Sequence, residues 1–231
     1  MKKLGILSGG AAQGLVEALR PTFEAATGCT IEGTFGAVGA MRARLLGGAP
    51  ADLVILTRAL IDDLARDGHV AAATVADLGT VETAIAVRRG DAPPPVGDAP
   101  ALRAALLDSD AIHFPDPEQA TAGIHFDKVL RQLGIRDEVA ARLKTAPNGA
   151  TAMRELAAST SRRPIGCTQA TEILSTPGIA LVGPLPPGCA LATVYTAATA
   201  TKAEAPAEAA QLVTMLTNAT SRESRRRLGF V

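Results

Sequence analysis

The stretch LSGGAAQGLVEAL, from Leu7 to Leu19, shows how the fold begins. An apolar strand over Leu4–Leu7 runs into a glycine pair, and a helical pattern of apolar residues follows almost at once. A helix that starts directly after a strand presents free N–H groups there, and these groups can hold an anion. The loop has no Lys and matches neither the phosphate-binding loop nor the dinucleotide fingerprint. We therefore expect an anionic ligand other than a nucleotide phosphate.

Strand-like and helix-like segments alternate along the rest of the chain, which predicts an α/β fold with mostly parallel sheets flanked by helices. The strands are expected at Leu4–Leu7, Thr30–Thr34, Asp52–Leu56, Thr83–Val87, Ala111–Phe114, Pro164–Cys167, Ile179–Val182 and Leu191–Thr196. The helices are expected at Ala12–Thr27, Ala40–Leu46, Ala59–Asp67, Ala101–Leu107, Gly123–Leu133, Asp137–Leu143, Ala150–Ala158, Pro206–Asn218 and Ser221–Leu228.

The composition excludes several classes of function. Lys plus Arg and Asp plus Glu both number 23, whereas nucleic-acid and membrane-surface binders normally have a basic excess. Five Phe, one Tyr and no Trp offer little for stacking on bases. Cys29, Cys167 and Cys189 lie at wide spacings without a zinc-ligand pattern. One disulfide is compatible with them, but buried free thiols are the simpler expectation. We predict no metal, no cofactor and no nucleic-acid partner.

The N-terminus gives an expectation about localisation. Lys2 and Lys3 precede apolar residues, but the apolar run breaks at Ser8, so no export-signal core is present. No run of about 18 apolar residues occurs either, which argues against membrane insertion. The chain as it stands is expected to be cytoplasmic, or periplasmic if a leader has been removed. The sequence predicts no oligomeric state.

Four loops share the features of the opening stretch. Each combines small residues with a bare glycine or a capping side chain just before a helix, at Ser8–Ala11, Gly36–Ala40, Thr121–Gly123 and Asn148–Thr151. Any one of them is also ordinary turn chemistry. Since ligands of open α/β sheets bind beyond the carboxyl ends of the strands, four such loops favour a shared anion site.

Several motifs resemble the molybdate-binding type of periplasmic solute-binding protein. These are Gly48-Ala49-Pro50-Ala51-Asp52-Leu53, the turn at Thr34–Ala37, Asp116-Pro117-Glu118 with Thr121–Ile124, Pro164–Gly166 with Gln169–Glu172, and the Gly229-Phe230 ending. The resemblance implies the type II fold, with two lobes around a ligand cleft, in a branch without an export signal. It places lobe 1 at residues 1–83 and 195–231 and lobe 2 at residues 84–194.

The resemblance also implies ligand positions, with three departures. Ala11 and Val38 stand where the family carries ligand Ser residues, and Gln169 stands where it carries a Tyr. The backbone position at Ala122 matches, and Thr151 lies near another contact. Arg58 follows a strand and is a candidate for binding an anion. The expected ligand-binding set is Ser8, Gly9, Gly10, Ala11, Gly36, Ala37, Val38, Gly39, Arg58, Thr121, Ala122, Gly123, Asn148, Gly149, Thr151, Thr168, Gln169 and Tyr195.

Three functions are compatible with these residues. The first is binding of a small organic anion, a di- or tricarboxylate, without chemistry. The second is an isomerase on the same scaffold, as in aconitate-isomerase-type relatives of these binders; His125 would be the base, with Ser8 or Glu118 as its partner. The third is molybdate or tungstate binding for a transporter. The missing hydroxyls at Ala11 and Val38 argue against the third, because unpaired oxyanion charge is costly when buried.

Overall fold

The computed structural model describes residues 2–231 and divides into two compact units. Unit 1 comprises Met1–Val81 and Thr193–Val231, and unit 2 comprises Glu82–Ala192. The chain enters unit 2 within strand β4 (Ala76–Arg88) and leaves it at the start of β9 (Ala192–Thr199). The sequence-based division was drawn after residues 83 and 194.

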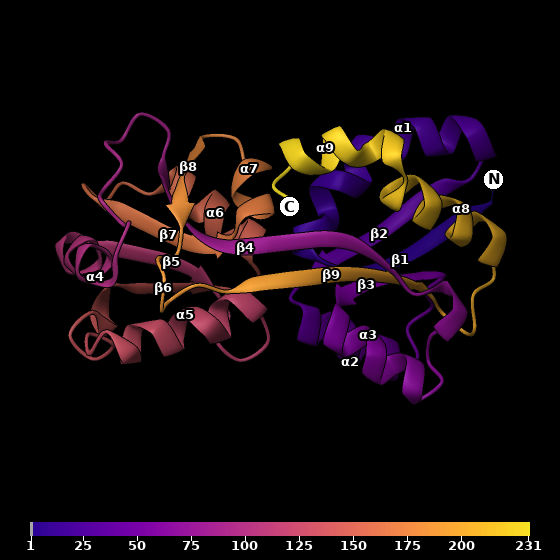
Figure 1. Cartoon of the computed structure of the whole chain (residues 1–231), viewed down its shortest axis with the longest axis horizontal. Coiled ribbons are helices and arrows are strands. Elements are labelled where there is room, and N and C mark those ends of the chain that lie inside the picture. The colour runs from indigo at the N-terminus through magenta and orange to yellow at the C-terminus, as the bar shows by residue number, and fades with distance from the viewer. Residues whose placement is uncertain (1) are drawn as a thin grey trace. The chain divides into compact units, whose positions relative to one another are not determined.

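Unit 1 is built on three parallel strands, β1 (Lys3–Gly9), β2 (Thr30–Gly36) and β3 (Leu53–Thr57), with β9 antiparallel to β3. Helices α1 (Gln13–Thr27), α8 (Pro206–Thr217) and α9 (Arg222–Arg227) lie on one side of this sheet. Helices α2 (Val38–Leu46) and α3 (Arg58–Arg66) lie on the other side (Figure 1). Three short turns of 3-10 helix complete the unit, namely η1 (Gly10–Ala12), η2 (Ala72–Thr74) and η4 (Ala219–Ser221). Because helices cover both faces, β1 buries apolar side chains on both.

Unit 2 repeats this plan with parallel strands β5 (Ala111–Pro115), β6 (Leu143–Ala146) and β7 (Pro164–Gln169). Strand β4 runs antiparallel to β7, and β8 (Ile179–Pro184) runs antiparallel to β4. Helices α4 (Ala99–Asp108) and α5 (Thr121–Gln132) cover one face, and α6 (Gly149–Ala158) and α7 (Ala170–Leu174) cover the other (Figure 1). The 3-10 turn η3 (Ala140–Arg142) precedes β6.

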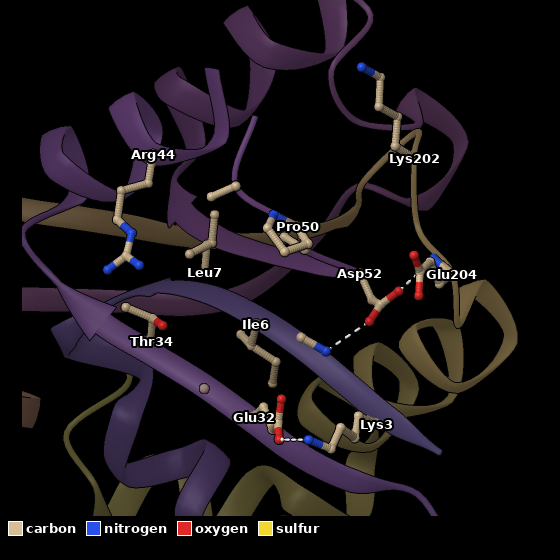
Figure 2. A pocket seen from close by; sticks show the side chains of 14 residues that line it. Lys3, Ile6, Leu7, Glu32, Thr34, Arg44, Pro50, Asp52, Lys202 and Glu204 are labelled. Carbon is tan, nitrogen blue, oxygen red and sulfur yellow. Dashed lines mark hydrogen bonds and ion pairs between the residues drawn. The ribbon is translucent and has the colours of Figure 1, made fainter. Parts of the chain in front are cut away.

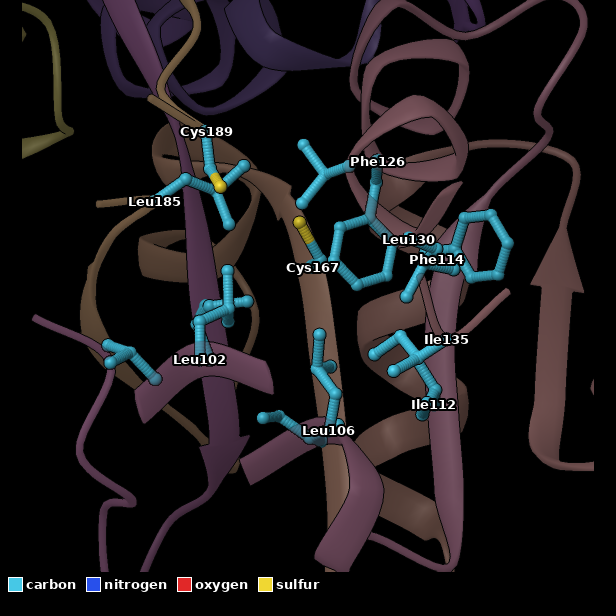
Figure 3. Packing of buried hydrophobic residues seen from close by; sticks show 14 of the residues in the cluster. Leu102, Leu106, Ile112, Phe114, Phe126, Leu130, Ile135, Cys167, Leu185 and Cys189 are labelled. Atoms are coloured by element: carbon cyan, nitrogen blue, oxygen red, sulfur yellow. The ribbon is translucent and has the colours of Figure 1, made fainter. Parts of the chain in front are cut away.

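The hydrophobic core of unit 2 lies between its sheet and helices α4 and α5 (Figure 3). Phe114 of β5 and Phe126 of α5 meet edge to face, with ring centroids 5.3 Å apart and an interplanar angle of 67°. Leu102 and Leu106 of α4 pack into the same cluster as Cys167 of β7. Since burying one such apolar side chain contributes about 1.5–3 kcal/mol, this cluster fixes α5 against β5 and β7.

The alternating α/β pattern predicted from the sequence is confirmed, but the expected helix over 137–143 is wrong. The chain forms only the η3 turn there and then enters β6, which pairs in parallel with β5. The Arg142 guanidinium donates to the carbonyl oxygens of Leu107 (2.7 Å), in the last turn of α4, and Ser109 (2.6 Å), directly after α4. These contacts are distant in sequence, and they outweigh the local helical spacing.

Candidate functional site

In unit 1 the carboxyl ends of the parallel strands are in register. Ser8 of β1 lies opposite Phe35 of β2 and Ile55 of β3, and Gly9 lies opposite Gly36. Turn η1 and helices α2 and α3 begin directly beyond these ends. Among residues 2–231, no side chain caps the start of any of these three segments. Their first N–H groups therefore face the same edge of the sheet without a side-chain acceptor.

Gly9 allows this edge to close tightly. A Cβ atom at position 9 would lie 2.8 Å from Cγ1 of Val38 and 3.2 Å from Cε1 of Tyr195. Tyr195 lies on β9 opposite Thr57 of β3, and its side chain is buried. Ala11 is buried as well. The opening loop, the start of α2 and Tyr195 thus form one compact group, and the side chains of Ala11 and Val38 bring no hydroxyl to it.

Two of the candidate polar side chains of unit 1, those of Ser8 and Arg58, already have partners. Ser8 is fully buried, and its hydroxyl donates to the carbonyl oxygen of Gly9 at 2.9 Å. The Arg58 guanidinium bonds Asp62 at 2.9 Å and Asp77 at 3.1 Å, and both carboxylates raise the pKa of Arg58. Asp77 also accepts a hydrogen bond from Thr196 at 2.7 Å. An anionic ligand would compete with two carboxylates for Arg58, so this residue is a weaker ligand candidate than the loop amides.

In unit 2 helix α5 begins without a side-chain cap on its N-cap residue, Ala120, within the described part of the chain. The Ile124 N–H donates back to Ala120 at 2.9 Å, so the N–H groups of the three preceding residues lie ahead of the helical ladder. Gly123 is required where it stands, because a Cβ atom would overlap the carbonyl oxygens of Pro115 and Asp116. The predicted anion-binding segment Thr121–Gly123 therefore starts a helix that is seated directly on the end of β5.

Helix α6 differs, because the protein's own groups occupy its N-terminus. Asn148 accepts a hydrogen bond from the Thr151 N–H at 2.9 Å. The buried Glu172 carboxyl group accepts from the Thr168 hydroxyl at 2.5 Å and from the backbone of Ala150 and Gln169. Burial raises the pKa of Glu172, while these hydrogen bonds oppose the rise.

Gly149 and Thr151 belong to the same arrangement. A Cβ atom at position 149 would overlap the carboxyl group of Glu172 and the hydroxyl of Thr168. The Thr151 hydroxyl accepts from Arg154 at 2.8 Å. Four predicted ligand residues, namely Asn148, Gly149, Thr151 and Thr168, thus have internal structural partners.

Gln169 is a predicted ligand residue with a buried side-chain amide. It is 2% exposed, yet neither Oε1 nor Nε2 has a hydrogen-bond partner among the described residues. The hydroxyls of Thr83 and Thr171 in the same unit are likewise buried and unpaired within that part of the chain. Leaving such a group unmet costs about 1–3 kcal/mol, so these atoms mark a place that a ligand or water would fill.

The candidate catalytic residues are held in different surroundings. His125 lies in α5, and its Nε2 donates to the carbonyl oxygen of Cys189 at 2.7 Å, so Nδ1 is the ring nitrogen left to accept a proton. Glu118 is exposed on the loop before α5, where its N–H donates to Asp116 at 2.7 Å. Ser8 belongs to unit 1, and both His125 and Glu118 belong to unit 2.

Three further buried polar groups lie outside the predicted ligand set. His113 of β5 has no partner for either ring nitrogen within residues 2–231, and burial, then the charge of Lys144, lowers its pKa. Thr83 falls in an expected strand and Glu172 in the motif Gln169–Glu172, but neither spacing nor composition shows which polar groups are buried away from water. Only the antiparallel pairing of β4 with β7 would have suggested Thr83 as a site residue, because it places Thr83 opposite Gln169.

A separate pocket of about 470 Å³ lies within unit 1 (Figure 2). None of the predicted ligand residues lines it. Lys3 pairs with Glu32 at 2.6 Å and Asp52 accepts three backbone N–H groups, so these side chains join segments of unit 1. Arg44, Lys202 and Glu204 also line the pocket.

Within residues 2–231, no three His, Cys, Asp or Glu side chains are grouped to hold a metal ion. None of the helices in that range combines the length and apolar character needed to span a membrane.

Both a protein family and a curated relative match most of this chain. The model of a family described as bacterial extracellular solute-binding protein matches residues 4–231. An aconitate isomerase from a Pseudomonas species is 29% identical over 222 residues, which cover 92% of this chain and 81% of that protein.

Two solved structures show the fold. The periplasmic molybdate-binding protein of Azotobacter vinelandii is 19% identical with a TM-score of 0.81, over 99% of this chain and 98% of that chain. The sulfate-binding protein SubI of Mycobacterium tuberculosis H37Rv is 16% identical with a TM-score of 0.76, over 100% of this chain and 86% of that chain. The predicted two-lobed binding-protein fold, similar to that of molybdate binders, is confirmed.

Proposed function

The chain belongs to the bacterial extracellular solute-binding protein family, and from this premise we propose that it binds a small organic anion, a di- or tricarboxylate. The observation that carries the proposal is the set of uncapped helix starts beyond the carboxyl ends of the strands. Such N–H groups favour an anion without needing a cationic side chain. Each unit supplies such N–H groups, those of α5 in unit 2 and those of η1 and α2 in unit 1.

The side chains around these loops favour a carboxylate over a metal oxyanion. The side chains of Ala11 and Val38 are buried and apolar, so they add no donor for a compact tetrahedral anion that needs several donors at once. A di- or tricarboxylate spreads its charge over separate groups, each of which one helix start can bind. The related aconitate isomerase has a name that refers to a tricarboxylate, which supports the same class of ligand.

A thermal-shift screen followed by calorimetry tests the proposal. The probes are succinate, malate, tricarballylate, citrate and trans-aconitate, with molybdate, tungstate and sulfate as competing oxyanions. We expect at least one carboxylate to raise the melting temperature and to bind with one-to-one stoichiometry. If molybdate or tungstate alone stabilises the protein, the third function is correct and this proposal fails.

A matched pair of variants tests whether the start of α5 binds the anion. Thr121→Pro removes the first N–H group of α5, and the extended backbone of Ala120 (φ −100°, ψ 128°) tolerates a following proline. Thr121→Ala removes the same side chain but keeps the N–H group. We expect Thr121→Pro to weaken carboxylate binding while Thr121→Ala binds as the parent does. Equal affinities in both variants would exclude this N–H group from the site.

The isomerase remains a second candidate, because the aconitate isomerase relative covers most of the chain. A proton shift along an unsaturated acid needs a base within hydrogen-bond reach of the substrate. In His125 that base would be Nδ1, with Nε2 held by Cys189. Proton NMR of cis- and trans-aconitate in deuterated buffer would show isomerisation or solvent exchange. An unchanged rate in His125→Gln would remove His125 from the mechanism, and no exchange in the parent protein would leave binding alone.

A further inference from the structure

Gln169 and Thr83 form a pair of unused polar groups on one face of the unit 2 sheet. Gln169 ends β7, and Thr83 lies directly opposite it on the antiparallel strand β4. Directly opposed residues of antiparallel strands project to the same face, with Cβ atoms about 4.5–5.5 Å apart. Both side chains are at most 2% exposed, and none of their polar atoms has a partner within residues 2–231.

The pair continues the face of β7 that packs against α5. Cys167, two residues before Gln169, belongs to the core cluster with Phe126 of α5 (Figure 3). Thr168 projects to the opposite face, where it bonds Glu172. Gln169 is therefore on the side of the sheet that carries α5, near the carboxyl ends of β7 and β5. The uncapped start of α5 follows that end of β5.

The chemistry of a primary amide restricts what can satisfy it. Gln169 presents a donor at Nε2 and an acceptor at Oε1 side by side, and neither has a partner within residues 2–231, whichever way the amide is turned. Fully ionised molybdate, sulfate or a plain dicarboxylate offers only acceptors and would leave Oε1 unpaired. An α-hydroxycarboxylate offers an accepting carboxylate oxygen next to a donating hydroxyl, which matches both atoms.

Resting on the proposed binding of an organic anion, we propose that Gln169, together with Thr83, selects a hydroxy acid. The ligand carboxylate accepts from Nε2 of Gln169, and the adjacent ligand hydroxyl donates to Oε1. The Thr83 hydroxyl can donate to the ligand or accept from it. The helix starts bind the remaining negative charge, so the side-chain pair determines which acid is preferred.

Matched ligands that differ by one hydroxyl test this selection. Calorimetry would compare malate with succinate, and citrate with tricarballylate. We expect the parent protein to prefer the hydroxylated member of the bound pair by on the order of tenfold, the effect of about one net hydrogen bond. Gln169→Met has similar length and no hydrogen-bonding amide, and it should abolish the preference. Gln132→Met, at an exposed glutamine of the same unit, is the matched control and should keep it.

Thr83→Val retains the shape of the side chain and provides a second test in case the Gln169→Met variant does not fold. It should lower the affinity for the hydroxylated acid several-fold and leave the affinity for its partner unchanged. Equal binding of both members of each pair by the parent protein would overturn the selection by Gln169 while leaving carboxylate binding intact. A preference that survives in Gln169→Met would do the same. Failure to bind any carboxylate would overturn the proposed function itself.

Discussion

Replacing Asp52 should destabilise unit 1 more than any surface carboxylate, because this side chain joins three segments. Its Oδ2 accepts from the Gly5 N–H at 2.7 Å, and its Oδ1 accepts from the Glu204 N–H at 2.7 Å (Figure 2). The same Oδ1 also accepts from the Ala205 N–H at 2.8 Å. The main chain of Asp52 also bonds Gly5 and Ala200. Asp52 is 7% exposed, so water does not readily replace the carboxylate.

The size of the effect follows from the number of hydrogen bonds. A hydrogen bond to a charged group contributes about 1.5–3 kcal/mol. In Asp52→Ala, water can reach the N–H of the exposed Glu204, but those of Gly5 and Ala205 lose their acceptor. We therefore expect Asp52→Ala to lower the free energy of unfolding by about 3–5 kcal/mol. Asp52→Asn keeps one oxygen and loses chiefly the bond to Gly5, which predicts a loss of about 1.5–3 kcal/mol.

Urea unfolding followed by far-UV circular dichroism measures these losses, since the chain has no Trp for fluorescence. If the two units unfold in separate steps, only the step of unit 1 should move. Asp63→Ala is the control, because Asp63 pairs with the exposed Arg66 at 2.9 Å, a type of pair that contributes at most about 1 kcal/mol. A midpoint for Asp52→Ala equal to that of Asp63→Ala would refute the reasoning.

Three further predictions follow from close contacts and buried groups. Gly123→Ala should displace the start of α5 and cost about 1–3 kcal/mol of overpacking, whereas Gly97→Ala, with open space around its Cβ, should be nearly neutral in the same urea assay. The pKa of His113 is lowered in the folded protein, so the unfolded chain binds more protons than the folded one. The free energy of unfolding should therefore fall as the pH drops from the usual histidine pKa of 6.5 towards the folded-state pKa. His113→Leu should lack this loss in unfolding curves measured from pH 7 to pH 5. Ala11→Ser combined with Val38→Ser should strengthen any molybdate-induced shift in melting temperature, and no change would show that other groups exclude molybdate.

Much of the fold could be predicted because local signals and tertiary structure agree. Strand β1 is apolar on both faces, and α1 ends at Gly28, whose φ of 67° suits glycine. The prediction of a helix over 137–143 failed because the spacing of its apolar residues fits a helix, whereas the contacts that decide its structure lie far away in sequence. Strand β4 begins at Ala76, ahead of the expected Thr83, since its pairing depends on neighbouring strands that the local pattern does not show.

The candidate site was predictable as a set of loops but not as a set of available donors. The sequence marks Thr121–Gly123 and Asn148–Thr151 equally, as small residues before a helix. The structure separates them, because Asn148 and Glu172 occupy the start of α6 and no side chain among residues 2–231 caps α5. Whether a helix start can bind a ligand depends on which buried side chains fold back onto it, and that is a tertiary property.

This distinction also bears on the choice of ligand. Backbone N–H groups only donate, so a site made of helix starts alone would accept any anion of suitable size. Gln169 adds an acceptor next to a donor. Because its side chain is buried with no partner among residues 2–231, a ligand that cannot pair with both atoms is costly to bind. Sites that pair their polar groups with a ligand hydroxyl reject analogues without it far better than apolar pockets reject a missing methylene. In this chain the helix starts would therefore supply affinity for negative charge, and one side-chain amide would supply discrimination among the acids that carry it.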